Sequence, residues 1–112
     1  MNPNNMGDLL RQVTRMRKDM DRVQEGLKTR FVEAKAGGDL VEVTLNGQQD
    51  LIKVSISPKI FESGGEGKVD VELLEDLIVA AVSQGIEKSK ALMKEEMERV
   101  TGGLGGLLPG MF

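Results

Sequence analysis

The 112-residue sequence contains no histidine, cysteine, tyrosine or tryptophan. Without histidine there is no imidazole to act as a general base or metal ligand, and without cysteine there is no thiolate nucleophile, cysteine zinc site or disulfide. No Ser/Lys or carboxylate pair stands in a recognisable catalytic spacing. We therefore expect a protein that is not an enzyme and that uses no metal, no cofactor and no small-molecule substrate.

Long hydrophobic runs are also missing. The first thirty residues lack the apolar run of roughly 7–15 residues that marks a signal peptide. Nowhere does the sequence contain the apolar stretch of about 20 residues that spans a bilayer. These absences predict a cytoplasmic protein without a membrane segment. The length suits one domain. A monomer of this size would leave about a third of the unfolded chain's surface exposed to solvent, so association with a second copy would help to bury apolar surface.

The net charge of −3 hides an uneven distribution. Residues 1–30 carry seven basic and four acidic side chains, whereas residues 31–70 and 71–112 each carry four basic and seven acidic ones. Only the first segment is basic. Because an acidic surface repels a polyanion, the first segment is the side from which an anionic partner would approach.

The first segment has the apolar spacing of a helix. Its apolar residues alternate in steps of three and four, which gives a narrow apolar seam suited to packing against one other helix. This apolar seam consists of Met6, Leu9, Val13, Met16, Met20, Val23 and Leu27. We expect its members Leu9, Val13, Met16 and Met20 to hold the two helices together with Met93 and Met97.

After Thr29 the spacing becomes that of strands, which are predicted over residues 31–36, 40–45 and about 49–57. Gly37-Gly38 forms the first turn, and Asn46-Gly47 predicts a tight hairpin turn whose two central residues both have positive φ. The third strand ends at Pro58, which lacks an amide donor. Ile52, Val54 and Ile56 fall on one of its faces. The result is a three-stranded antiparallel meander with one apolar face.

A second helix is predicted from an N-cap at Asp70 to about Val100. Its first half is broadly apolar and suits a position over the sheet, while its second half has a narrow stripe and projects. We therefore predict an α+β fold of the order α-β-β-β-α, in a single domain over residues 1–101. Residues 102–112 form a Gly/Leu-rich tail, which is either a flexible end or a segment that docks on a partner or the other subunit through Leu107, Leu108 and Phe112.

Four cations of the first helix share one face. On a helical wheel, Arg15, Lys18 and Arg22 lie within about 40° of Arg11 and almost opposite the apolar seam. Arginines in such a row can contact DNA phosphates without regard to sequence. A solvated helix face shows the same pattern, with Asp19 or Asp21 pairing with these cations, and a membrane-surface helix is the third possibility. We call Arg11, Arg15, Lys18 and Arg22 the basic stripe.

Other charged groups give weaker signals. A second set of cations, interleaved with acids on the projecting half of the second helix, comprises Lys88, Lys90, Lys94 and Arg99. The carboxylates of residues 70–76 are explained by a helix start rather than by a metal. Residues 64–68 superficially resemble a phosphate-binding loop, but Glu62 replaces the required glycine and Val69 the Ser/Thr that holds magnesium.

Four segments in register resemble the YbaB/EbfC family of bacterial nucleoid-associated proteins. Residues 37–47 look like the family's hairpin, G-G-x-x-V-x-V-x-x-x-G, and residues 54–58 look like its strand end, V-x-I-x-P. Residues 74–81 are similar to the opening of its second helix, and residues 97–103 to its M-x-x-x-T-G-G exit. The resemblance covers roughly residues 6–110.

The resemblance implies a homodimer joined largely through the sheets, with helices that project like the arms of tweezers. It also implies binding of duplex DNA with low sequence specificity, in nucleoid organisation and gene regulation. We expect phosphate contacts from the basic stripe and, as a second set, from Lys88, Lys90, Lys94 and Arg99. The alternative is a dimeric protein-interaction module whose Met-bearing arms and apolar tail bind a partner protein.

Overall fold

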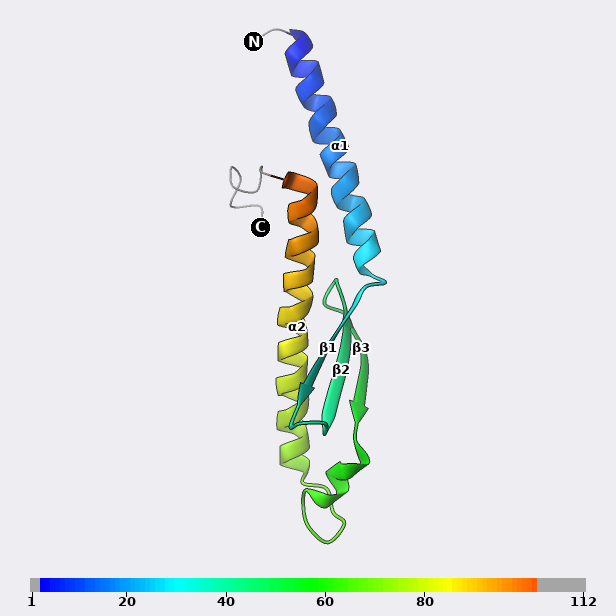
Figure 1. The fold of residues 1–112 in the computed structure, drawn as a ribbon, viewed down its shortest axis with the longest axis vertical. Helices are drawn as coiled ribbons and strands as arrows, with labels where there is room; N and C mark the ends of the chain where they lie inside the picture. The colour runs from blue at the N-terminus through cyan, green and yellow to red at the C-terminus, as the bar shows by residue number, and fades with distance from the viewer. Residues whose placement is uncertain (1–2, 103–112) are drawn as a thin grey trace.

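A computed structural model describes residues 3–102, which form two long helices and three strands (Figure 1). In chain order the elements are α1 (Pro3–Leu27), β1 (Phe31–Ala36), β2 (Val41–Asn46), β3 (Leu51–Ile56), the 3-10 helix η1 (Pro58–Glu62) and α2 (Val71–Thr101). The three strands form one antiparallel sheet in the order β1-β2-β3. The predicted α+β fold and its meander are therefore confirmed, while residues 103–112 of the predicted tail lie outside the described residues.

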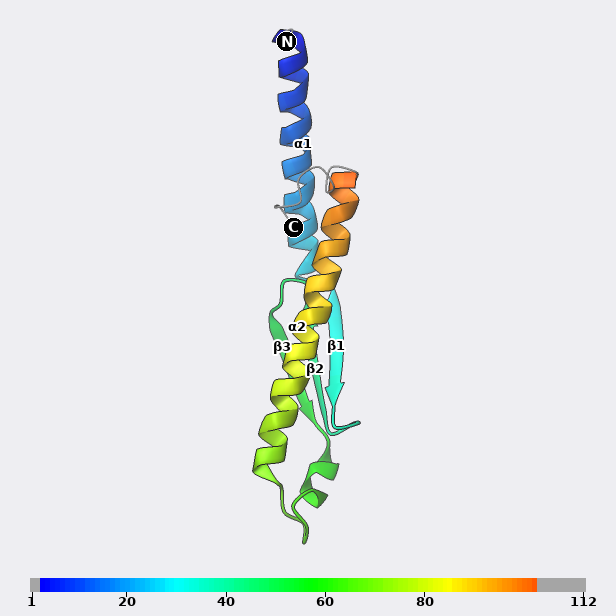
Figure 2. The same ribbon diagram turned by 90° about the vertical axis from the view of Figure 1, so that its left-hand side faces the viewer.

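The molecule is a rod of 79 × 23 × 15 Å with a radius of gyration of 20.9 Å. A compact domain of 100 residues would have a radius of gyration of about 13 Å. The extra length comes from α1, whose N-terminal half projects past the end of α2 and away from the sheet in both views (Figures 1 and 2). The predicted projecting helix is thus present in a single chain.

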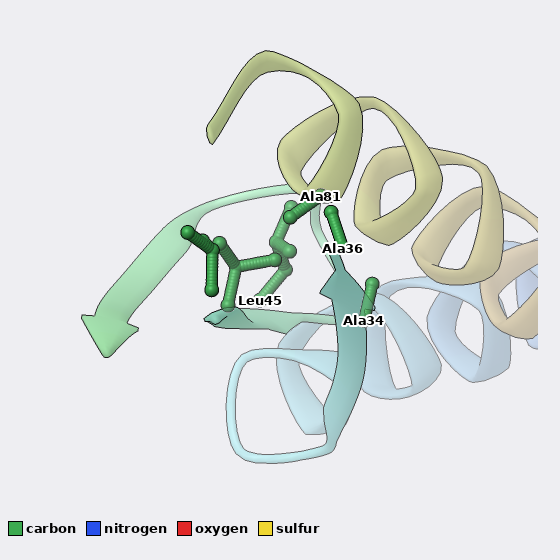
Figure 3. Close-up of a cluster of buried hydrophobic side chains, with 6 residues drawn as sticks. Ala34, Ala36, Leu45 and Ala81 are labelled. Atoms are coloured by element: carbon green, nitrogen blue, oxygen red, sulfur yellow. The ribbon is translucent and has the colours of Figure 1, made fainter. Parts of the chain in front are cut away.

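The core lies between α2 and the first two strands. Ala34 pairs with Val43 and Ala36 with Val41, so alternate side chains of β1 and β2 point at α2. These residues are buried together with Leu45 and with Ala81 of α2 (Figure 3). The small side chains of β1 let the helix approach the sheet closely.

The two hairpin turns differ in their chemistry. Gly37 and Gly38 both have positive φ, 64° and 69°, as the β1–β2 turn requires. The prediction of a two-residue turn at Asn46-Gly47 is wrong, because the positive φ of 65° belongs to Gln49. The backbone N–H of Asn46 donates to the Asp50 carbonyl oxygen at 3.0 Å and closes a wider loop.

Glycine is needed at position 47 because of a helix rather than because of the turn. A Cβ atom on Gly47 would lie 2.6 Å from Cδ2 of Leu27, the last residue of α1. The Gly47 backbone N–H donates to the Leu27 carbonyl oxygen at 2.9 Å. The β2–β3 loop therefore sits directly against the end of α1 and fixes where that helix leaves the sheet.

The β3 strand is shorter than predicted and is shifted by an irregularity. Leu51 rather than Ile52 pairs with Leu45, because the register shifts between Thr44 and Leu45. Beyond it, Val54 pairs with Val43. Val54 therefore lies on the apolar side of the sheet, as predicted. All six residues of β3 are exposed, since α2 packs on β1 and β2.

The two ends of α2 lie close to the residues predicted from the sequence. Asp70 is the N-cap, and its Oδ1 accepts a hydrogen bond from the Leu73 backbone N–H at 3.0 Å. The helix ends at Thr101, one residue beyond the predicted end. Pro58 ends the third strand as predicted and also opens η1, a 3-10 helix capped by Ser57 that the sequence analysis missed.

Candidate nucleic-acid interface

The basic stripe lies on the exposed face of α1, as the helical wheel predicts. Arg11 and Arg22 expose 78% and 81% of their side chains. Arg15 and Lys18, between them, are exposed as well. Arg11, Arg15 and Lys18 border one shallow depression on the helix surface, together with Leu10 and Thr14. Three of the four cations thus converge on one place.

Acidic neighbours neutralise the two ends of the basic stripe but leave its middle uncompensated. Arg11 forms an ion pair with Asp8 at 3.3 Å, and Arg22 forms one with Asp19 at 3.6 Å. Within residues 3–102, no acidic side chain lies within ion-pair distance of Arg15 or Lys18. Exposed pairs of this kind contribute little stability, so a phosphate can displace them at low cost.

The apolar seam is only partly covered by α2. Near the sheet Leu27 is buried, and Val23 and Val100 line a shallow crevice between the two helices. Farther along α1, Leu9 and Val13 are each about half exposed, at 50% and 51%. The expectation that these two residues hold α1 to α2 is therefore wrong within one chain, since the N-terminal half of α1 projects past the end of α2 (Figure 1).

A buried serine of α2 holds the β2–β3 loop in place. The Ser89 hydroxyl donates to the Asn46 carbonyl oxygen at 2.6 Å. It accepts from the backbone N–H of Gln49 at 3.0 Å and from Gln49 Nε2 at 2.9 Å. On the other side of the loop, Gln48 Nε2 donates to the Gln24 carbonyl oxygen of α1 at 2.6 Å. The loop therefore joins α2 to α1 and sets the direction in which the basic stripe is presented.

An ion-pair cluster reinforces this junction. Glu96 of α2, whose side chain is 15% exposed, lies 2.8 Å from an Arg30 guanidinium nitrogen and 3.3 Å from one of Arg99. Arg99 also pairs with Glu95 at 3.4 Å. Arg30 follows α1 directly and was missed by the sequence analysis, because only the fold brings it to α2. Its link to Glu96 ties the base of α1 to the helix beside it.

The second set of cations does not form one surface. The Lys88 ammonium donates to the Glu33 carbonyl oxygen of β1 at 2.8 Å, and Arg99 is engaged by Glu95 and Glu96. Lys90 and Lys94 are exposed one helical turn apart. They point away from Lys88, since two residues along a helix turn by about 200°. A DNA contact from this set remains a prediction, and its members do not share a face.

The part of the chain that the structure describes holds no cluster of three or more acidic side chains placed to bind a metal ion. Neither of its long helices has an apolar stretch sufficient to cross a membrane.

Comparisons with known proteins assign the family. The model of the YbaB/EbfC DNA-binding family matches residues 1–104. A nucleoid-associated protein of Acetivibrio thermocellus is 42% identical over 96% of this chain and 90% of its own length, and one of Pelotomaculum thermopropionicum is 39% identical over 96% of both chains.

A solved structure shares the fold. An uncharacterized protein from Helicobacter pylori superposes with a TM-score of 0.69 and 24% identity, over 91% of this chain and 99% of that one. The family is one of DNA-binding proteins and not of enzymes. Family match and relatives agree over nearly the whole length, and the chain belongs to the YbaB/EbfC DNA-binding family.

Proposed function

We propose that this protein is a nucleoid-associated protein that binds duplex DNA as a homodimer, with low sequence specificity, through phosphate contacts from the basic stripe of α1. In this role it contributes to nucleoid organisation and gene regulation in the bacterial cytoplasm. The relatives named as nucleoid-associated proteins support the cellular role. The chemistry of the contact is argued from the described residues.

One observation carries the proposal: Arg15 and Lys18 are exposed on a projecting helix, and within residues 3–102 neither has an acidic partner. The basic stripe spans about 16 Å of helix, so it can reach several phosphates at once. Binding would release the counterions condensed on those phosphates, which favours association without base readout. The chain has no Tyr, Trp or His and only three Phe, so few side chains are available to stack on exposed bases, which disfavours single-strand binding.

The exposed strand β3 supports the homodimer. Its apolar residues Leu51, Ile52, Val54 and Ile56 expose between 39% and 53% of their surface. An uncovered apolar edge strand is a site for association, and proteins normally protect such edges. A second copy that covers β3 would bury these side chains and present two copies of α1, doubling the number of phosphate contacts.

The proposal is tested by titrating labelled random-sequence duplex DNA across a series of salt concentrations. The logarithm of the affinity should fall steeply with the logarithm of the salt concentration, with a slope of about 0.9 per phosphate contact. In the double variant Arg15→Glu/Lys18→Glu binding should be lost or nearly lost, while the oligomeric state stays unchanged. Arg15 and Lys18 are both exposed, so neither substitution changes a residue of the core.

The matched control is Lys59→Glu/Lys68→Glu, which changes the net charge by the same amount. Both lysines are exposed and lie near η1, at the end of the rod opposite the tip of α1 (Figure 1). The control should keep most of the affinity if contact, rather than net charge, decides binding. Equal losses in the two double variants, or binding that salt does not weaken, would refute the phosphate-contact proposal.

The alternative function, a protein-interaction module, is favoured by the exposed apolar seam at the tip of α1. Such binding would rest on apolar burial, which salt does not weaken. The same titrations therefore separate the two functions: a module of this kind would show no binding of duplex DNA that depends on Arg15 and Lys18.

A further inference from the structure

The N-terminal half of α1 carries an apolar surface that nothing in the described structure covers. Met6, Leu9 and Val13 of the apolar seam are exposed by half or slightly more, and Leu10 beside them by 62%. Val13 also borders a shallow hollow with Met16 and Met20. Four large apolar side chains at half exposure on one helix form a patch that soluble proteins normally shield.

The C-terminal segment of the same chain has the apolar composition needed to cover this patch. The last helix, α2, ends at Thr101, and Gly102 turns the chain with a φ of 55°. Ten more residues follow, and none of them is charged. Five of the ten are large and apolar: Leu104, Leu107, Leu108, Met111 and Phe112. The family model matches residues 1–104, so its match ends within this segment.

The length of this C-terminal segment and its point of attachment are also compatible with covering the apolar seam. The end of α2 lies beside α1, since Val100 and Val23 line the same crevice. The uncovered seam from Met6 to Met16 is about 15 Å long at 1.5 Å per residue, and its far end at Met6 lies about 26 Å along α1 from Val23. A fully extended chain of ten residues reaches about 33 Å. Residues 103–112 can therefore cover the whole uncovered seam from their point of attachment.

We propose that residues 104–112 pack on the apolar seam of α1 in the same chain, over Met6, Leu9, Val13 and Met16. A tethered segment is held near its site at millimolar effective concentration, which gives it an advantage over a free partner. The docked segment leaves the basic stripe open, because the stripe lies on the opposite face of α1. This proposal concerns the apolar face alone and does not rest on DNA binding.

The absence of native cysteine makes the test specific. A full-length Val13→Cys/Leu107→Cys variant is treated with a short bismaleimide and analysed by intact mass and by gel. We expect rapid cross-linking within one chain. The matched control is Arg15→Cys/Leu107→Cys, whose reactive position lies on the opposite face of α1, and it should cross-link much more slowly.

Two outcomes would overturn the proposal. Equal cross-linking rates in the two variants would show that the segment has no preferred face. Cross-links between chains, found when singly substituted Val13→Cys and Leu107→Cys proteins are mixed, would make a second copy the occupant of the seam.

Hydrogen exchange provides a measurement that does not use cysteine variants. The full chain is compared with a variant that ends at Gly102. We expect slower amide exchange over residues 6–16 in the full chain, at low and at high salt alike, because apolar docking resists screening. Identical exchange in the two proteins would refute docking. Since this readout contains no DNA, its failure is distinguishable from a failure of the proposed function.

Discussion

Replacing Ser89 with alanine should destabilise the protein by about 2 kcal/mol, because it removes the link between α2 and the β2–β3 loop. The hydroxyl makes three hydrogen bonds, to Asn46 and Gln49, and is fully buried. At about 1 kcal/mol each, these bonds contribute about 3 kcal/mol. Alanine's higher helix propensity returns about 0.5 kcal/mol. Gln49 keeps a second acceptor for each N–H donor, in the Asn46 and Gly47 carbonyl oxygens, which lowers the loss further.

The assay is urea unfolding followed by circular dichroism, since the chain has no tryptophan or tyrosine for fluorescence. At a slope of about 2 kcal/mol per molar urea, the midpoint should fall by about 1 M. Ser83→Ala is the matched control, because Ser83 lies on the exposed side of α2 and the same propensity gain applies. All proteins are compared at one concentration, because association adds to apparent stability. Equal midpoints for the two variants would refute the role assigned to Ser89.

Two further predictions use similar matched pairs. Gly47→Ala should cost about 1–3 kcal/mol in urea unfolding, because its Cβ would crowd Leu27, whereas Gly26→Ala, with nothing within 4 Å, should stabilise α1 by up to about 1 kcal/mol. A stable Gly47→Ala protein would contradict the packing described for this loop. Val54→Asp should shift the protein towards monomer in sedimentation experiments, whereas Ser55→Asp, on the opposite face of β3, should have a smaller effect. An unchanged association state in Val54→Asp would exclude the apolar side of β3 as the interface.

Periodicity was sufficient to predict the helices and the meander. The seam of α1 repeats over three heptads, and β1 runs over the predicted residues 31–36. The N-cap at Asp70 also followed from local chemistry, because a carboxylate can accept the free N–H groups of a first helical turn. Features that depend on neighbours in sequence were thus predictable.

Features that depend on tertiary contacts were not. The glycine at position 47 looks like a turn residue, but its lack of a Cβ serves the approach of Leu27, which lies 20 residues away in sequence. The register shift at Thr44 and the pairing of Arg30 with Glu96 arise in the same way. For the candidate site, the wheel placed the basic stripe on one face, but it could not show which cations of α2 are engaged elsewhere, as Lys88 is by Glu33.

The central claim is that the outer face of α1 lies against the DNA backbone. It is tested most directly by tethering an iron chelate to a single cysteine in this cysteine-free chain and mapping hydroxyl-radical cleavage of bound duplex. The site is Gln12→Cys, an exposed position adjacent to Arg11 in sequence and about 60° around the helix from Arg15, and the control is Glu66→Cys in the exposed loop at the other end of the rod. Neither substitution removes a cation. We predict strong cleavage from position 12 and background cleavage from position 66; background cleavage from both positions, or stronger cleavage from position 66, would contradict the claim.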